Sequence, residues 1–518
     1  MPSPGRRLGA ALALAAALLA APPAAADDFV DRANQLYAGV GQAKRSDLVM
    51  MPLLAAMNEP PAELQADELT PLLVLPGMTD WAALEAWALA PEQAAVIAAL
   101  GKVTEDENPQ TRMVFALPYG VEATPVEMVQ AELYVELGDP PTLSAAEFLY
   151  LPRLKWVFAL AHVEANRRAG AGDMPGAMDV LIDSIGFARQ IADREFMAEK
   201  LVGMGAMYTG INHLRDVANR DLGAETRGLS AEQVREMLRR LDPKRAALSL
   251  DRILLPKGDR IATEQLLHRV YVPRSGPNPE TFAATLARIS VEDRPLRLFA
   301  EAARWERVQD QAAGWFEVME ALNRVYDDWV KRWSLSPHDP LLNTSSDFQK
   351  IVVGQLKYAP LAQVLGDTDK LFRARRMLEV EASGTRMAFG VYGYFLQHRV
   401  FPPALTSIRP SFVSAVENDP FDHSRRTLRY FVPIRDTPEG EHGDLRPHEM
   451  RVFPPKPYAP FSLSFREPTQ FILYSRGPDG DDSFARDVTQ SEEGGDYLLW
   501  PPLVSLLRKN LVDQGQLN

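Results

Sequence analysis

Hydrophobic residues recur at helical spacing over most of the chain. Residues 27–103 follow this pattern and predict mostly helix, and Pro91 stands where the first residue of a helix is expected. Between residues 111 and 138, runs punctuated by proline predict short strands or an irregular linker. A long helical block follows over residues 144–369.

This block predicts an array of helical hairpins. We expect its first helix to begin with a capping box formed by Ser144 and Glu147. Residues 295–333 predict either one very long helix or a hairpin, and "SSDFQKIVVGQLKYAPLAQVLG" predicts a further helix. Small residues at helical spacing in "GMGAMYTGINH", residues 203–213, predict close helix packing. A repeat of ~34 residues is not sustained, so the chain is not a tetratricopeptide-type repeat protein.

The hydrophobic period changes near the carboxyl end. A long helix is predicted from Thr368 to about Val400, and "TLRYFVPI", "FSLSFRE" and "QFILYSRG" then alternate as strands do. The predicted fold class is therefore mainly α: a large helical-hairpin domain followed by an α+β domain with a small antiparallel sheet. The predicted boundaries are 27–143 for a mostly helical region, 144–369 for the helical domain and 370–518 for the α+β domain.

The first 26 residues have the pattern of a secretory signal peptide. Arg6 and Arg7 precede a short apolar run, residues 8–21, and small residues at 24–26 form a cleavage site. The run is too short for a membrane anchor, which needs about 20 apolar residues. We therefore expect an exported, periplasmic or secreted protein, with no stable membrane insertion after the leader is cleaved.

Composition narrows the possible chemistry. The chain of 518 residues has no cysteine, which excludes disulfides, cysteine-ligated zinc, iron–sulfur clusters and thiol catalysis. Its formal net charge of −13 makes nucleic acid and anionic membrane surfaces poor partners and cations better ones.

Negative charge gathers in one loop near the carboxyl end. Its acids are Asp479, Asp481, Asp482, Asp487, Glu492, Glu493 and Asp496. Within the loop only Arg486 opposes them, and Gly477 and Gly480 allow tight turns. Two interpretations stay open on composition: a solvated acidic turn, or a calcium site built from carboxylates and main-chain carbonyls. An EF-hand is excluded, because Phe484 and Gln490 stand where that loop needs Gly and Glu.

A set of short motifs runs through the last third of the chain in a characteristic order. They are Phe401-Pro402 with Leu405, Asp419-Pro420-Phe421, Leu428 with Tyr430, Leu473-Tyr474-Ser475, Gly477, Asp479-Gly480, and Asp496 with Trp500. In this order the segment from about residue 370 to 500, about a quarter of the chain, resembles the globular part of the major pseudopilins of type II secretion and related type IV pilin-like proteins.

The resemblance implies a calcium ion in the acidic loop. Asp479 and Asp496 match the family's ligands, and Asp481 and Asp482 are further candidates. Two features depart from the family: a secretory leader replaces the prepilin signal and membrane helix, and "SFARDVTQSEEGG" replaces the glycine-rich part of the loop.

Signatures of catalysis are missing from the sequence. The eight histidines include no H-E-x-x-H and no pair at ligand spacing, and His162 is expected to be a packed helix residue. No nucleophile elbow, P-loop or dinucleotide fingerprint occurs. The sequence favours a non-catalytic scaffold or interaction protein with a structural calcium site and an unidentified protein partner. Two alternatives remain: a hydrolase with its cleft in the helical domain, and an accessory protein of a type II-like secretion system.

Overall fold

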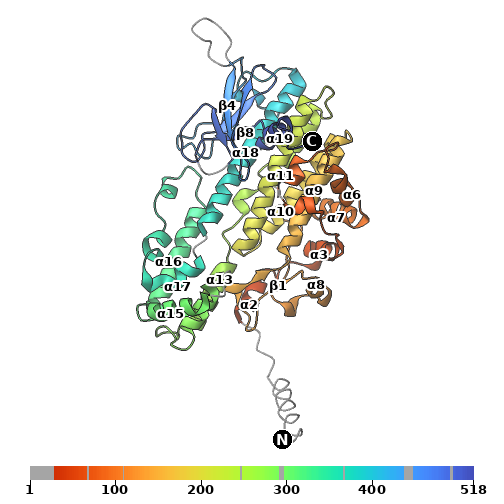
Figure 1. Cartoon of the computed structure of the whole chain (residues 1–518). Coiled ribbons are helices and arrows are strands. Elements are labelled where there is room, and N and C mark those ends of the chain that lie inside the picture. Colours follow the sequence, from red (N-terminus) through yellow and green to blue (C-terminus); the bar gives the residue numbers. More distant parts are fainter. Residues whose placement is uncertain are drawn as a thin grey trace.

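The computed structural model describes residues 28–66, 69–108, 110–244, 248–290, 297–365, 368–436, 447–490 and 494–518. The predicted signal peptide lies outside the described residues, as do Glu492 and Glu493 of the acidic loop. The protein is mainly helical, with one sheet at one end of the molecule beside a long helix, α18 (Figure 1). The predicted helical character is thus confirmed.

Short helices make up the N-terminal part. They are α2 (Asp28–Gln35), α3 (Asp47–Ala56), α4 (Ala62–Ala66), α5 (Thr70–Leu73), α6 (Trp81–Ala88), α7 (Pro91–Thr104) and α8 (Val126–Gln130). A two-stranded antiparallel ribbon follows, with β1 (Val135–Glu136) and β2 (Glu147–Phe148). Helix α7 begins at Pro91 as predicted.

Longer helices form the centre: α9 (Leu151–Gly170), α10 (Met174–Ala192), α11 (Met197–Gly223) and α12 (Ala231–Arg240). The predicted capping box at Ser144 is wrong. Ser144 lies in a 3₁₀ turn and Glu147 in β2, while α9 begins only at Leu151. A distant contact explains the difference, because the backbone N–H of Leu143 donates to the side chain of Gln265 and holds this segment away from the helix.

A helical arm follows, on the left of Figure 1. It comprises α13 (Gly258–Val270), α14 (Phe282–Ser290), α15 (Leu298–Gln309), α16 (Trp315–Trp333) and α17 (Ala359–Leu365). The segment predicted as one very long helix or a hairpin forms two helices, α15 and α16. The next predicted helix is interrupted: a π turn ends at Val352, Gly354 adopts a φ of +77°, and α17 starts only at Ala359.

The carboxyl-terminal part begins with α18 (Thr368–His398) and ends with α19 (Leu503–Asp513). Between them lie β3 (Arg429–Phe431), β4 (His448–Phe453), β5 (Phe461–Phe465), β6 (Ile472–Ser475), β7 (Asp487–Thr489) and β8 (Asp496–Trp500). The three strands predicted here are confirmed as β3, β5 and β6. The predicted small antiparallel sheet is wrong in detail: the order is β3-β6-β8-β7-β4-β5, and β7 runs parallel to both β4 and β8.

Glycines permit two close contacts that join these parts. A Cβ atom at Gly203 of α11 would lie 2.3 Å from the backbone nitrogen of Ala192 in α10, which confirms the predicted close helix packing. A Cβ atom at Gly384 of α18 would lie 2.3 Å from the Leu499 side chain of β8. One cluster of buried hydrophobic residues consequently extends from Ala33 to Trp500. The boundaries at residues 143 and 369 stay predictions, and this core crosses both.

Within the described residues, no helix is both long and apolar enough to cross a bilayer.

Candidate functional site

The acidic loop lies between β6 and β8, which are neighbours in the sheet. It starts where β6 ends at Ser475, includes β7 and ends where β8 begins at Asp496. Gly477 and Gly480 adopt positive φ angles of +77° and +74°, so both glycines make the turns predicted from the sequence. The strands thus bring the two ends of the loop together beside β3.

Asp419 fastens the start of the loop to the segment before β3. Its Oδ1 atom accepts hydrogen bonds from Ser475 Oγ at 2.7 Å and from the Phe421 backbone N–H at 3.0 Å. Its Oδ2 atom accepts from the Arg476 backbone N–H at 3.0 Å. Two of the motifs identified in the sequence therefore meet through one buried carboxylate.

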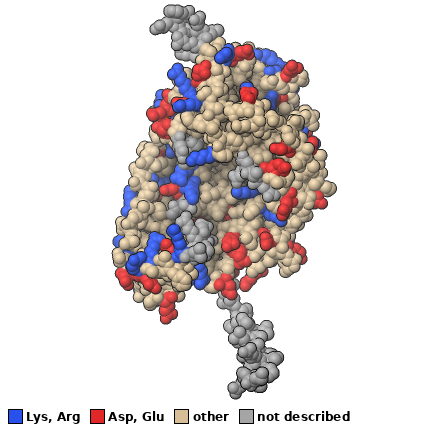
Figure 2. All heavy atoms as spheres, viewed as in Figure 1, with Lys and Arg blue, Asp and Glu red and all other residues tan. Residues whose placement is uncertain are grey.

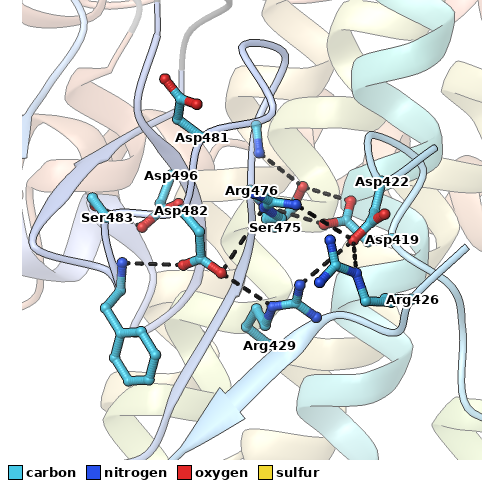
Figure 3. A network of polar contacts seen from close by, with 12 residues as sticks. Asp419, Asp422, Arg426, Arg429, Ser475, Arg476, Asp481, Asp482, Ser483 and Asp496 are labelled. Carbon is cyan, nitrogen blue, oxygen red and sulfur yellow. Dashed lines mark hydrogen bonds and ion pairs between the residues drawn. The ribbon is translucent and has the colours of Figure 1, made fainter. Parts of the chain in front are cut away.

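Two arginines, Arg429 from β3 and Arg476 from the start of the loop, balance Asp482. Arg429 Nε lies 3.3 Å from Asp482 Oδ2, and Arg476 Nε lies 3.9 Å from the same atom (Figure 3). The Tyr474 hydroxyl donates to Asp482 Oδ1 at 3.0 Å. Both arginines also approach Asp422, which pairs with Arg426 at 2.9 Å. These arginines therefore offset part of the negative charge that the loop sequence carries.

Asp479 connects the two ends of the loop through hydrogen bonds from the backbone. Its Oδ2 atom accepts from the Gly495 backbone N–H at 2.7 Å, and its Oδ1 atom accepts from the Asp481 backbone N–H at 3.1 Å. The side chain of Asp481 points away from the other acids in Figure 3 and is exposed to solvent. These two predicted ligands therefore do not meet the others in this structure.

Asp496 is the unusual carboxyl of the group. It is fully buried, and its Oδ2 atom accepts from Ser483 Oγ and from the Ala485 backbone N–H, each at 2.7 Å. Its Oδ1 atom is also buried and has no hydrogen-bond partner among the described residues. Burial raises the pKa of Asp496 to about 6, and the charge of Asp482 adds to the rise.

Of the four predicted ligands, the structure brings Asp482 and Asp496 together. In Figure 3 both lie on the same side of Ser483, whose hydroxyl donates to Asp496. Across the described part of the chain, however, no three side chains of His, Asp or Glu converge as a metal cluster. The carboxylates present offer at most two side chains to a cation, so the remaining oxygen ligands would have to come from the backbone or from water. Sequence reasoning missed Arg429 of β3 and Arg476, since nothing in the loop sequence predicts that these cations lie beside Asp482.

A cleft lies apart from this loop, between α18 and the chain that follows α16. Its two adjoining hollows, of about 240 and 550 Å³, share Arg375 and Glu379 in their walls. The arginines lining them are Arg332, Arg373, Arg375, Arg376 and Arg386. Burial raises the pKa of Glu379 although Arg375 lies 3.1 Å away. In Figure 2, Lys and Arg side chains gather on the α15–α17 side of the face shown, around a recess in its middle.

Comparison with known proteins gave no match to a family model, to a curated protein or to a solved structure. The assignment of a site in this chain therefore rests on the geometry just described.

Proposed function

We propose that the chain is an exported, non-catalytic interaction protein whose carboxyl-terminal sheet is stabilised by one calcium ion beside Asp482 and Asp496. The buried Oδ1 atom of Asp496 carries this proposal. A carboxylate oxygen without a hydrogen-bond donor is costly in a buried site, and a cation would remove that cost. Calcium suits the position because it accepts carboxylates, carbonyls and water at relaxed geometry.

The arginines around Asp482 limit how tightly such an ion would bind. Arg429 and Arg476 already lie 3.3 and 3.9 Å from Asp482 Oδ2, so calcium must compete with them for this carboxylate. We therefore expect an affinity at the weak end for calcium sites, about 10⁻⁴ to 10⁻³ M, as in extracellular modules. An ion of this affinity stabilises the fold without acting as a signal.

A calcium titration followed by thermal unfolding tests the proposal. At about ten times the dissociation constant, calcium should add about 1.4 kcal/mol to the free energy of unfolding. Asp496→Asn should abolish the gain, while Asp481→Asn should keep it because Asp481 is exposed and points away. An unchanged melting temperature in the wild type, or an equal gain in Asp496→Asn, contradicts the calcium site.

Export of the chain and the identity of its protein partner need separate tests. A cleaved leader predicts that the mature chain starts near Asp27, which N-terminal sequencing of the protein from a periplasmic fraction determines. Cross-linking of the tagged full chain in cells would then identify the partner. Recovery of pseudopilins would favour the narrower role of an accessory to a type II-like secretion system, whereas an uncleaved cytosolic product contradicts export.

A second candidate, a hydrolase, is favoured by the cleft. Glu379, with its raised pKa, and His338, whose Nδ1 atom is buried without a partner among the described residues, both line it. Such a pair is a source of acid–base catalysis. Hydrolysis of a panel of nitrophenyl esters and glycosides by the wild type, lost in Glu379→Gln, would support this function. Equal turnover by the two proteins contradicts a role for Glu379.

A further inference from the structure

An open groove of about 580 Å³ lies between α9 and α11, far along the chain from the acidic loop. Its walls are largely apolar and include Trp156 and Phe158 from α9 and Leu201 from α11. At Gly205 an added Cβ atom would meet nothing within 4 Å, so the space above this residue is empty. His162 also lines the groove and is only 3% exposed.

We propose that this groove binds a small apolar molecule carrying one hydroxyl or N–H donor, and that the Nε2 atom of His162 accepts the hydrogen bond from that donor. A cavity of this size matches ligand sites, which combine apolar walls with a few placed polar groups. The proposal is independent of the calcium site.

A chain of hydrogen bonds fixes where the protons of this region lie. Asn166 donates through Nδ2 to the carbonyl of Pro71 at 2.9 Å, so its Oδ1 atom faces the other side. That oxygen accepts from Arg220 Nη2 at 2.6 Å and lies 3.1 Å from His213 Nε2. Because an amide oxygen only accepts, Nε2 of His213 must carry the proton.

The proton on His213 Nε2 determines the tautomer of His162. A neutral imidazole has one donor and one acceptor, so Nδ1 of His213 is an acceptor. Nδ1 of His162 lies 3.0 Å away and must therefore donate. Burial keeps both rings neutral by lowering their pKa values, that of His162 to about 4. The remaining nitrogen, Nε2 of His162, is left with a lone pair, and among the described residues the hydrogen bond of this ring is made by Nδ1.

The groove thus offers Nε2 of His162 as a fixed acceptor between largely apolar walls, which also include Lys155 and Thr209. A metal ion is a poor occupant, because no cluster of metal-ligating side chains occurs in the described part of the chain. A ligand without a donor would leave the His162 nitrogen unpaired once water is displaced, which costs affinity. The ligand that fits has an apolar body and one donor.

Binding of 2-naphthol and of its methyl ether, 2-methoxynaphthalene, to the full chain tests this proposal by calorimetry. In the ether a methyl group replaces the hydroxyl hydrogen, so the donor is lost while the aromatic body is kept. We expect 2-naphthol to bind roughly tenfold more tightly, as expected for one hydrogen bond in an apolar site. Failure of 2-naphthol to bind, or equal affinities of the two probes, overturns the proposal.

Two variants locate the site. At Gly205 an added Cβ atom meets nothing within 4 Å, so Gly205→Leu places a side chain in the groove and should abolish binding of both probes. Gly223→Leu, at the far end of α11 where a Cβ atom also meets nothing, should leave binding unchanged. His162→Phe should remove the tenfold preference and keep binding of the ether. Unchanged binding in Gly205→Leu overturns the proposal even where His162→Phe does not fold.

Discussion

The guanidinium of Arg508 in α19 forms a two-point ion pair with the carboxylate of Asp216 in α11, with N–O distances of 2.9 and 2.8 Å. Through Nε, Arg508 also donates to the carbonyl of Leu73 at 3.0 Å, so one side chain joins α19, α11 and α5. Burial alone would raise the pKa of Asp216, but the attraction of Arg508 and Arg220 holds it well below its ordinary value.

Loss of the Arg508 side chain should be severe. Arg508→Met leaves the buried Asp216 carboxylate with Arg220 at 3.4 Å and a hydrogen bond from the Ser505 hydroxyl. The free energy of unfolding should fall by about 3–5 kcal/mol in urea titrations. Lys509→Met is the matched control, because its pair with Asp513 is mostly exposed and contributes about 0–1 kcal/mol. Similar losses in the two variants would show that the buried Arg508–Asp216 pair stabilises the fold no more than the exposed Lys509–Asp513 pair.

Asp496 should make the calcium-free protein less stable as pH rises. Its pKa of about 6 in the folded state exceeds the ordinary 3.8, so the folded state binds more protons and loses stability as pH increases from about 4 to 6. We expect Asp496→Asn to remove this loss and to be about 1–2 kcal/mol more stable than the wild type at pH 7 without calcium. Urea unfolding between pH 4 and 7 measures the free energy of unfolding of both proteins. The prediction is contradicted if this free energy falls as steeply with pH in Asp496→Asn as in the wild type.

The paired histidines should act in the opposite direction. The pKa of His162 is lowered to about 4 from 6.5, so the unfolded state binds more protons and stability falls as pH decreases from about 6.5 to 4. The loss from this residue amounts to at most about 3 kcal/mol. In His162→Phe the pH dependence over this range should be shallower, and the same titration series measures it. An unchanged slope would mean that His162 has the same pKa in the folded and unfolded states.

Two glycines on the same helix should respond oppositely to alanine. Gly203→Ala forces a methyl group against the backbone of α10 and should cost about 1–3 kcal/mol. Gly205→Ala meets nothing and should stabilise by about 0.5–1 kcal/mol through helix propensity. Thermal unfolding measures the melting temperatures of both variants against the wild type. A raised melting temperature in Gly203→Ala would disprove the close contact between α10 and α11.

Features that depend on nearby residues could be predicted from the sequence. Pro91 alone predicts the start of α7, and apolar residues that recur at helical spacing over a long segment predict α18. Strands β3, β5 and β6 could be predicted because apolar and polar residues alternate along each of them and turn residues bound each run. The parallel pairing of β7 with β4 and β8 could not be predicted, because it depends on which strands meet in space. The start of α9 was missed for a similar reason, since a contact with Gln265 overrides the local capping pattern at Ser144.

The candidate site shows the same division. The acidic loop and its two turning glycines are evident in the sequence, but the arginines that balance Asp482 come from β3 and the end of β6. The unpaired oxygen of Asp496 results from the burial of this residue at the start of β8. The composition of the loop does not indicate that burial. The contact between His162 and His213 joins two helices across 51 positions, so no spacing rule for paired histidines could find it.

The position of Arg508 also bears on the order of events during folding. Its partner Asp216 lies 292 positions earlier, and its carbonyl acceptor on Leu73 lies 435 positions earlier. The entropy of closing such long loops must be lost before these contacts gain anything, which slows their formation. We therefore expect α19 to dock late during folding, so that the Asp216 carboxylate stays hydrated until Arg508 reaches it.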